Sequence, residues 1–167
     1  MPHASWKGFL RLSLVSCPVY LSLATEENEL TEKDRNAFQA MKSNVIDLAQ
    51  FVDRGEIDPL YLNTSYYVYP DGELAAESFR VIAEKMAAKG LVGIGRVTLF
   101  NTERLVMFEP RGAGMVMFTL RGADEVRAGA FDTKRQENID AEMLDITDAI
   151  VERRRSTFDP ARLLDEH

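Results

Sequence analysis

Three stretches of strand-forming residues follow one another over residues 91–120 and are joined by very short loops. Strands are predicted at residues 91–100, 104–109 and 115–120, with turn-forming residues between them. Two parallel strands need a crossover of about a dozen residues or more, and these loops are much shorter. The region therefore predicts an antiparallel meander, which constrains the fold more than any other feature of the chain.

A second strand-rich region covers residues 5–24. Apolar and polar side chains alternate around Leu10 and Leu12, as in a strand with one buried face. Pro18 lacks a backbone N–H group and predicts an edge or a bend between two strands. Residues 66–69 are aromatic and β-branched, which indicates one more strand.

Helical patterns separate and follow these strands. Residues 74–89 carry a stripe of apolar side chains at helical spacing, and Gly90 is suited to a left-handed C-cap. A shorter helix is predicted over residues 31–41, a short strand over 45–52 and a second main helix over 139–155. The predicted fold class is α+β, with an antiparallel β-barrel or barrel fragment and two main flanking helices.

The charge is distributed unevenly along the chain. The 167 residues carry a net charge of −7, which argues against attraction of the whole surface to nucleic acid. Segments 1–24 and 91–122 nevertheless each carry +2, segments 25–60 and 123–167 each carry −5, and segment 61–90 carries −1. The total therefore conceals two mildly basic, strand-rich segments.

Motifs for catalysis and for metal binding are absent from the sequence. Cys17 is the single cysteine, and the two histidines, His3 and His167, lie at opposite ends, so neither a disulfide framework nor a zinc cluster is expected. No phosphate-binding loop occurs, and no apolar run has the length of a membrane span. We expect a cytoplasmic protein without signal peptide, cofactor or enzymatic activity; an unrelated β-rich enzyme is the least supported alternative.

The N-terminal region carries a specific family pattern. Residues 4–21, ASWKGFLRLSLVSCPVYL, closely resemble the opening of bacterial Ku proteins, in which an aromatic-x-Gly motif and an alternating strand begin the Ku β-barrel. Several further short segments match the same family in order and spacing, and together they cover most of the chain. They are residues 57–62, 65–70, 78–89, 95–97, 103–105, 120–121, 125–127 and 158–160.

The resemblance implies a ring-forming homodimer that threads onto double-stranded DNA ends in bacterial non-homologous end joining. Such a ring recruits an ATP-dependent DNA ligase, usually ligase D, and acts at the nucleoid without a membrane. It grips duplex DNA by backbone and shape, and it needs a basic lining rather than a basic exterior. The candidate phosphate-binding residues are basic side chains of the strand-rich segments: Lys7, Arg11, Arg96, Arg104, Arg111 and Arg121.

The chain is shorter than the family pattern at two places. Family members have several dozen more residues before the helix that matches at Thr31, and they have a longer, often lysine-rich extension after the point where this chain ends. A barrel left open by the first shortening would expose strand edges that seek partners. The alternative expectation is a shortened Ku relative that dimerises as a protein-interaction module without encircling DNA.

The expected organisation is a single Ku-like core domain over residues 1–167, made of four segments. They are the first barrel strands at 1–24, a shortened bridge region with the short helix at 25–60, a strand–helix–meander at 61–122, and a C-terminal helix and tail at 123–167.

Overall fold

In the computed structural model, the chain forms two compact units, Met1–Arg127 and Ala128–His167, which are described separately below. The organisation as a single domain with four segments stays a prediction. The short helix expected over residues 31–41 lies outside the described part of the chain. The structure describes residues 4–25, 44–99, 101–129 and 138–165.

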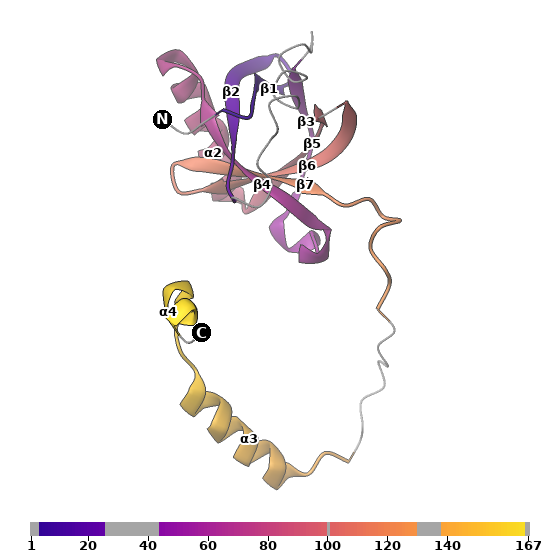
Figure 1. Ribbon diagram of the computed structural model, residues 1–167, viewed down its shortest axis with the longest axis vertical. Coiled ribbons are helices and arrows are strands. Elements are labelled where there is room, and N and C mark those ends of the chain that lie inside the picture. The colour runs from indigo at the N-terminus through magenta and orange to yellow at the C-terminus, as the bar shows by residue number, and fades with distance from the viewer. Residues whose placement is uncertain (1–3, 26–43, 100, 130–137, 166–167) are drawn as a thin grey trace. The chain divides into compact units, whose positions relative to one another are not determined.

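The first unit is a closed β-barrel in which seven described strands are paired in the order β1-β2-β4-β7-β6-β5-β3 (Figure 1). The predicted meander is confirmed, since β5, β6 and β7 pair antiparallel in sequence order. The strands are β1 (Trp6–Leu12), β2 (Val15–Leu23), β3 (Val45–Asp53), β4 (Leu62–Pro70), β5 (Leu91–Leu99), β6 (Thr102–Arg111) and β7 (Gly114–Leu120).

The closure of the barrel differs from a purely antiparallel arrangement. β1 and β3 pair in parallel, with Leu10 opposite Ile46. This direction is accessible because β2 and residues 24–44 lie between the two strands in sequence, which is enough chain to return to the same end of the sheet. Closure also leaves no unpaired edge among the described strands, so open edges give no reason to expect an unstable monomer.

The turn between the first two strands is not at the proline. The chain reverses at Ser13 and Leu14, where Ser13 has a positive φ of 55°. Pro18 lies within β2, and its carbonyl accepts the Asp71 N–H at 2.8 Å. The β2–β4 ladder begins one residue later, at Val19, so the missing N–H of Pro18 costs no bond of that ladder.

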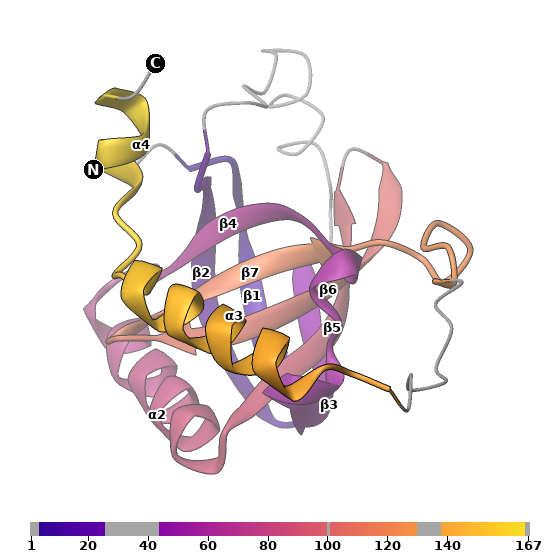
Figure 2. The same cartoon turned by 90° about the horizontal axis from the view of Figure 1, so that it is seen from below.

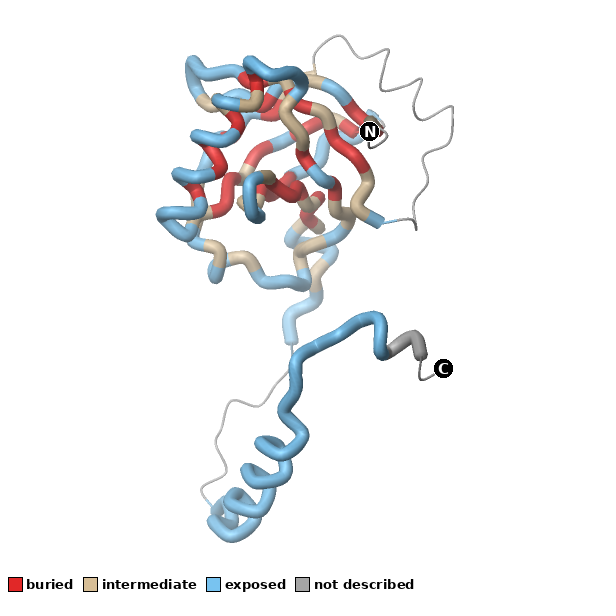
Figure 3. The backbone as a smooth tube through the Cα atoms, turned by 90° about the vertical axis from the view of Figure 1, so that its left-hand side faces the viewer, coloured by how far each residue is buried: buried red, intermediate tan, exposed pale blue. Residues whose placement is uncertain are grey.

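Helix α2 (Glu73–Lys89) packs against the barrel and confirms the predicted helical stripe (Figure 2). It buries Ala75, Phe79, Ile82 and Met86 in the same core as the inward-facing strand side chains, where Figure 3 shows the buried residues concentrated. Gly90 ends the helix with φ 66°, the left-handed conformation expected there.

A second, smaller apolar cluster lies on the outer side of the meander. Val92, Met107 and Leu120 are covered by partly buried side chains that include Ile57 and Tyr61. These two residues belong to a connection with two single-turn 3-10 helices, η1 (Arg54–Glu56) and η2 (Pro59–Tyr61). The outer positions Phe9 on β1 and Tyr67 on β4 remain exposed by contrast.

The described residues of the second unit form two helices. The predicted helix is confirmed as α3 (Ala141–Arg154), and the Asp140 side chain caps it by accepting the Glu142 N–H at 3.0 Å. The sequence interpretation of the last residues as a tail missed α4 (Pro160–Asp165), a helix of six residues. No helix in the described ranges combines the length and apolar character needed to cross a membrane.

Candidate nucleic-acid interface

Two of the predicted basic residues lie on β1 and β5, the two strands that flank β3 in the barrel. Arg11 of β1 is opposite Asp47 of β3, and Asp47 is in turn opposite Arg96 of β5. Side chains that are directly opposite each other share one face of a sheet. Leu10 and Ile46, the neighbours of this row, point into the core, so Arg11 and Arg96 lie on the outer face.

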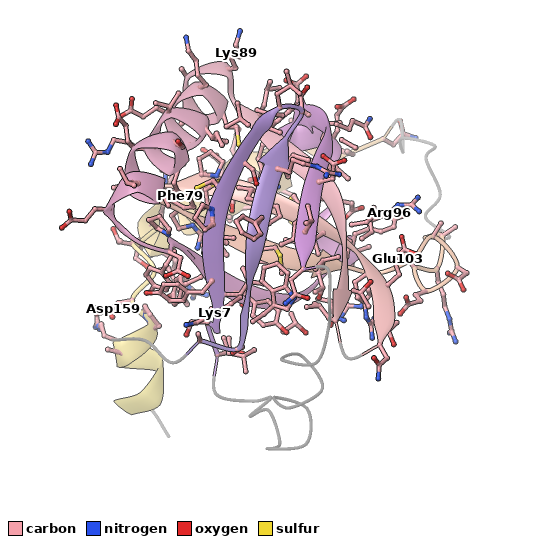
Figure 4. All side chains as sticks on the ribbon, turned by 90° about the horizontal axis from the view of Figure 1, so that it is seen from above. Lys7, Phe79, Lys89, Arg96, Glu103 and Asp159 are labelled. Atoms are coloured by element: carbon pink, nitrogen blue, oxygen red, sulfur yellow. The ribbon has the colours of Figure 1, made fainter. Side chains whose placement is uncertain are left out.

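Both of these arginines are paired with exposed carboxylates. Arg11 Nη2 lies 3.2 Å from Asp47 Oδ2. Arg96 Nη1 lies 3.5 Å from Glu103 Oε1, and Figure 4 labels both residues of this second pair. The Arg96 side chain is 74% exposed. Exposed ion pairs are worth at most about 1 kcal/mol, so a phosphate can replace either carboxylate at small cost. The pairing therefore leaves both guanidinium groups available to an anionic ligand.

Lys7 and Arg104 form no ion pair with any other residue that the structure describes. Lys7 is exposed on the outer face of β1. Arg104 is opposite Val97, whose side chain belongs to the inner core, so Arg104 lies on the inner face near the end of β6. Burial raises the pKa of the Tyr66 hydroxyl, and the nearby charge of Arg104 acts in the opposite direction.

Arg111 lies at the other end of β6 and shares a carboxylate. Glu109 accepts hydrogen bonds from Arg54 Nε and, at 2.8 Å, from Arg111 Nη2. Partial burial alone would raise the pKa of Glu109, but the hydrogen bonds and charges of the two arginines outweigh it and hold that pKa below its usual range. Two guanidinium groups against one carboxylate leave this cluster with a net charge of about +1.

Arg121 is held by backbone carbonyl groups. Its Nη1 donates to Leu60 O at 3.0 Å and to Leu62 O at 2.5 Å, which ties the end of β7 to the chain around η2. This is a structural contact, and a phosphate contact by the same side chain stays a prediction.

Sequence reasoning did not single out three tyrosines that gather on the outer faces of β2 and β4. The rings of Tyr20 and Tyr69 stack with centroids 5.1 Å apart, and the ring of Tyr67 lies 6.4 Å from that of Tyr69. The cross-strand register also aligns Tyr20 with Lys7 of β1. The alternation of side chains along β4 could have revealed them. Tyr66 and Val68 are buried, and Tyr67 and Tyr69 therefore point outward.

Two sizeable cavities flank α2. The larger, about 550 Å³, is mainly apolar and lies between α2 and the β1–β2 turn, where Leu12, Val15 and Val81 line it together with Lys85 and Lys89. The smaller, about 380 Å³, lies between α2 and the β6–β7 turn and includes arginine and tyrosine side chains. No group of metal-ligating side chains occurs within the described part of the chain.

The described residues of the first unit thus define a closed β-barrel domain with one packed helix and with basic and aromatic side chains on its outer surface. The sequence profile of the Ku family, described as the Ku70/Ku80 β-barrel domain, matches residues 28–146. The chain therefore belongs to the Ku family, and the resemblance found in the sequence is confirmed.

Similar proteins extend the match over nearly the whole chain. A protein of Allorhizobium ampelinum is 30% identical over 96% of this chain and 76% of its own length. One of Acidobacterium capsulatum is 33% identical over 100% of this chain and 72% of its own length. Both are named "Non-homologous end joining protein Ku".

The barrel also resembles a solved structure. The structure of the SPOC domain of human PHD-finger protein 3 matches with a TM-score of 0.53 over 71% of this chain and 97% of that chain. The two sequences are 9% identical, so the likeness concerns the fold alone.

The alignment with the Allorhizobium relative also measures the shortening. It extends over 207 positions and so exceeds the 167 residues of this chain by 40. The relative therefore has at least 40 residues without a counterpart here. This agrees in size with the several dozen residues that the family pattern led us to expect as missing.

Proposed function

We propose that this chain is a double-stranded DNA end-binding protein of bacterial non-homologous end joining. The observation that carries the proposal is the identity of 30% to 33% over nearly the whole chain with relatives that bear that name. The proposed form is a ring-forming homodimer that binds ends without sequence preference and recruits an ATP-dependent DNA ligase of the ligase D type. The chain acts at the nucleoid in the cytoplasm, without a cofactor and without catalysing a reaction itself.

The proposed contacts are ion pairs with the DNA backbone. Phosphate contacts hold a protein on the duplex but carry no sequence information, which suits a protein that must accept any broken end. Lys7, Arg11 and Arg96 lie on the outer surface of β1 and β5, the strands that flank β3. The remaining proposed contacts are Arg104, Arg111 and Arg121.

Competition between linear and circular DNA tests the proposal. A labelled linear duplex is bound at modest salt and is challenged with an unlabelled linear duplex or with a closed circular duplex of the same sequence. We expect only the linear competitor to displace the label efficiently, and duplexes of unrelated sequence to compete equally well. Equal competition by the closed circle would contradict end binding.

The second candidate function is that of a protein-interaction module: a shortened Ku relative that dimerises without encircling DNA. The alignment excess of 40 positions over the 167 residues and the net charge of −7 favour it. Light scattering after size exclusion, combined with the competition assay, separates the two functions. A dimer that ignores DNA ends supports the second candidate, and a dimer that prefers linear duplex supports the first.

A further inference from the structure

The cavity of about 380 Å³ lies where α2, the end of β4 and the β6–β7 turn meet, and we name it the tyrosine–arginine cavity. Tyr67 and Tyr69 contribute to its wall from β4, Arg80 from α2 and Arg111 from the end of β6. Phe79, which is labelled in Figure 4, lines it as well. Its volume falls in the range of small-ligand sites, about 300–1,000 Å³.

The strand register explains why the surface is hollow here. Tyr67 is opposite Val116 of β7, and Arg111 of β6 is opposite Gly114 of β7. Gly114 therefore lies between the β4 tyrosines and Arg111 and contributes no side chain. A Cβ atom at Gly114 would be 3.9 Å from its nearest neighbour, the Arg111 carbonyl oxygen, so the space beside it is open.

The tyrosines offer a flat apolar surface at this opening. Tyr67 is 45% exposed, although the two residues on either side of it in β4 are buried. The ring of Tyr69 is held in place by its stack with Tyr20, and it lies next to the ring of Tyr67. Rigid, exposed aromatic faces of this kind bind planar groups such as nucleobases by stacking, whatever the base.

The arginines give the same opening a positive charge. Arg80 forms no ion pair with the other residues that the structure describes. Arg111 shares the single Glu109 carboxylate with Arg54, so that cluster keeps a net positive charge. Guanidinium groups present several donors in one plane and bind phosphate oxygens in pairs.

We propose that the tyrosine–arginine cavity binds an unpaired nucleotide of a single-stranded overhang at a DNA end. Its base stacks on Tyr67, and its phosphate is held by Arg80 and Arg111. An acidic peptide would use the two arginines as well, but its carboxylates offer no planar group to the exposed tyrosine face. The inference rests on the proposed function and deepens it, because it assigns to one surface the single-stranded part of the end that the barrel binds.

The test compares one duplex in blunt form and with a short thymidine overhang of either polarity, with 2-aminopurine as the first unpaired base. We expect the wild-type chain to bind an overhang roughly fivefold or more tighter than the blunt end and to quench 2-aminopurine fluorescence. Tyr67→Leu removes the stacking face, and Gly114→Leu fills the opening without backbone strain. Both variants should lose the overhang preference and the quenching and keep the affinity for the blunt duplex.

Two variants serve as matched controls. Phe9 is 47% exposed on the outer face of β1, close to the 45% of Tyr67, but it does not line the cavity. Phe9→Leu should therefore retain the overhang preference. Arg80→Gln should weaken the preference, whereas Lys89→Gln, which removes an exposed cation from the other end of the same helix, should not.

Each outcome bears on one of the two proposals. Blunt-end binding by the wild-type chain without any overhang preference overturns this inference alone, and so does a preference that survives in Tyr67→Leu. In either result, an acidic peptide replaces the nucleotide as the expected ligand of the two arginines. No binding of the blunt duplex by the wild-type chain contradicts the proposed function instead. A labelled single strand then tests the cavity directly: quenching that Tyr67→Leu abolishes supports the inference, and no quenching overturns it.

Discussion

At the scale of single residues, Gly8 shows what the aromatic-x-Gly motif does physically. A side chain at Gly8 would collide with the Asn44 carbonyl oxygen and with the ring of Trp6. Trp6 is almost completely buried, and the Phe9 N–H donates to the same Asn44 carbonyl at 2.8 Å. The glycine therefore lets the tryptophan ring fold over β1 while β3 begins alongside it.

Gly8→Ala should be strongly destabilising, because the added methyl group meets backbone and a packed ring that have no room to move. We expect a loss of about 2 kcal/mol or more in the free energy of unfolding. The midpoint of urea unfolding measures it. Gly55→Ala is the matched control, since nothing lies within 4 Å of a Cβ atom at Gly55. Equal midpoints for the two variants would show that the close approach at Gly8 is not limiting.

Glu109 is a second residue whose environment makes a quantitative prediction. Its side chain is only 16% exposed and is hydrogen-bonded to Arg54 and Arg111. Because its pKa is lowered in the folded state, the charged form stabilises the fold above the unfolded pKa of about 4.3. That contribution is lost as the pH falls through the lower folded pKa.

Glu109→Gln should therefore cost about 1 kcal/mol at pH 7, a modest figure because Arg54 and Arg111 are partly exposed to solvent. The difference from the wild-type protein should shrink as both proteins are unfolded with urea at successively lower pH. A difference that stays constant down to pH values below about 3 would contradict the proposed ionic contribution.

At the scale of elements, local sequence patterns were sufficient to predict those elements whose contacts join residues close together in the chain. The β5-β6-β7 meander and the buried stripe of α2 depend on short loops and on helical spacing, and both were predicted. The parallel pairing of β1 with β3 was not, because it joins strands separated by another strand and a long connection. The true turn at Ser13 was missed because Pro18 is the stronger sequence signal for a break.

Cys17 links two of these elements. Its side chain is fully buried, and the thiol donates to Ala75 O of α2 at 3.3 Å. Burial raises the pKa of the thiol, which lowers the fraction of reactive thiolate. Native protein should therefore resist alkylation by iodoacetamide for as long as α2 stays on the barrel, while urea-unfolded protein should react fully. Mass spectrometry follows the modification, and rapid alkylation of the native protein would contradict this packing.

At the scale of the whole molecule, the barrel gathers charges that are far apart in the sequence. Arg11 and Arg96 are 85 positions apart in the chain, yet each is opposite Asp47 of β3, which lies between their strands. The six predicted residues do not form one patch, however. Arg104 lies on the inner face of the barrel, and Arg111 lies at the other end of β6. Arg121 donates hydrogen bonds to backbone carbonyl groups.

The proposed phosphate contacts predict a specific salt dependence. Each contact adds about −0.9 to the slope of log K against log salt concentration for duplex DNA. Lys7→Gln and Arg104→Gln should each make this slope shallower by about 1 and weaken binding equally for all sequences. Lys89→Gln, which is not among the proposed contacts, should leave the slope unchanged. Fluorescence anisotropy over a salt series measures all three, and unchanged slopes for Lys7→Gln and Arg104→Gln would remove them from the interface.

By itself, the sequence determined the class of elements, the meander, the helix α2 and the family, because these depend on local periodicity and on short motifs in a fixed order. Only the tertiary structure decided that the barrel closes through the parallel β1–β3 pair. It also decided which arginines are paired, and it placed Tyr67 and Arg80 beside Arg111 around one cavity. The physical reason is that these contacts join distant segments through strand register, and register is set by the packing of the whole barrel.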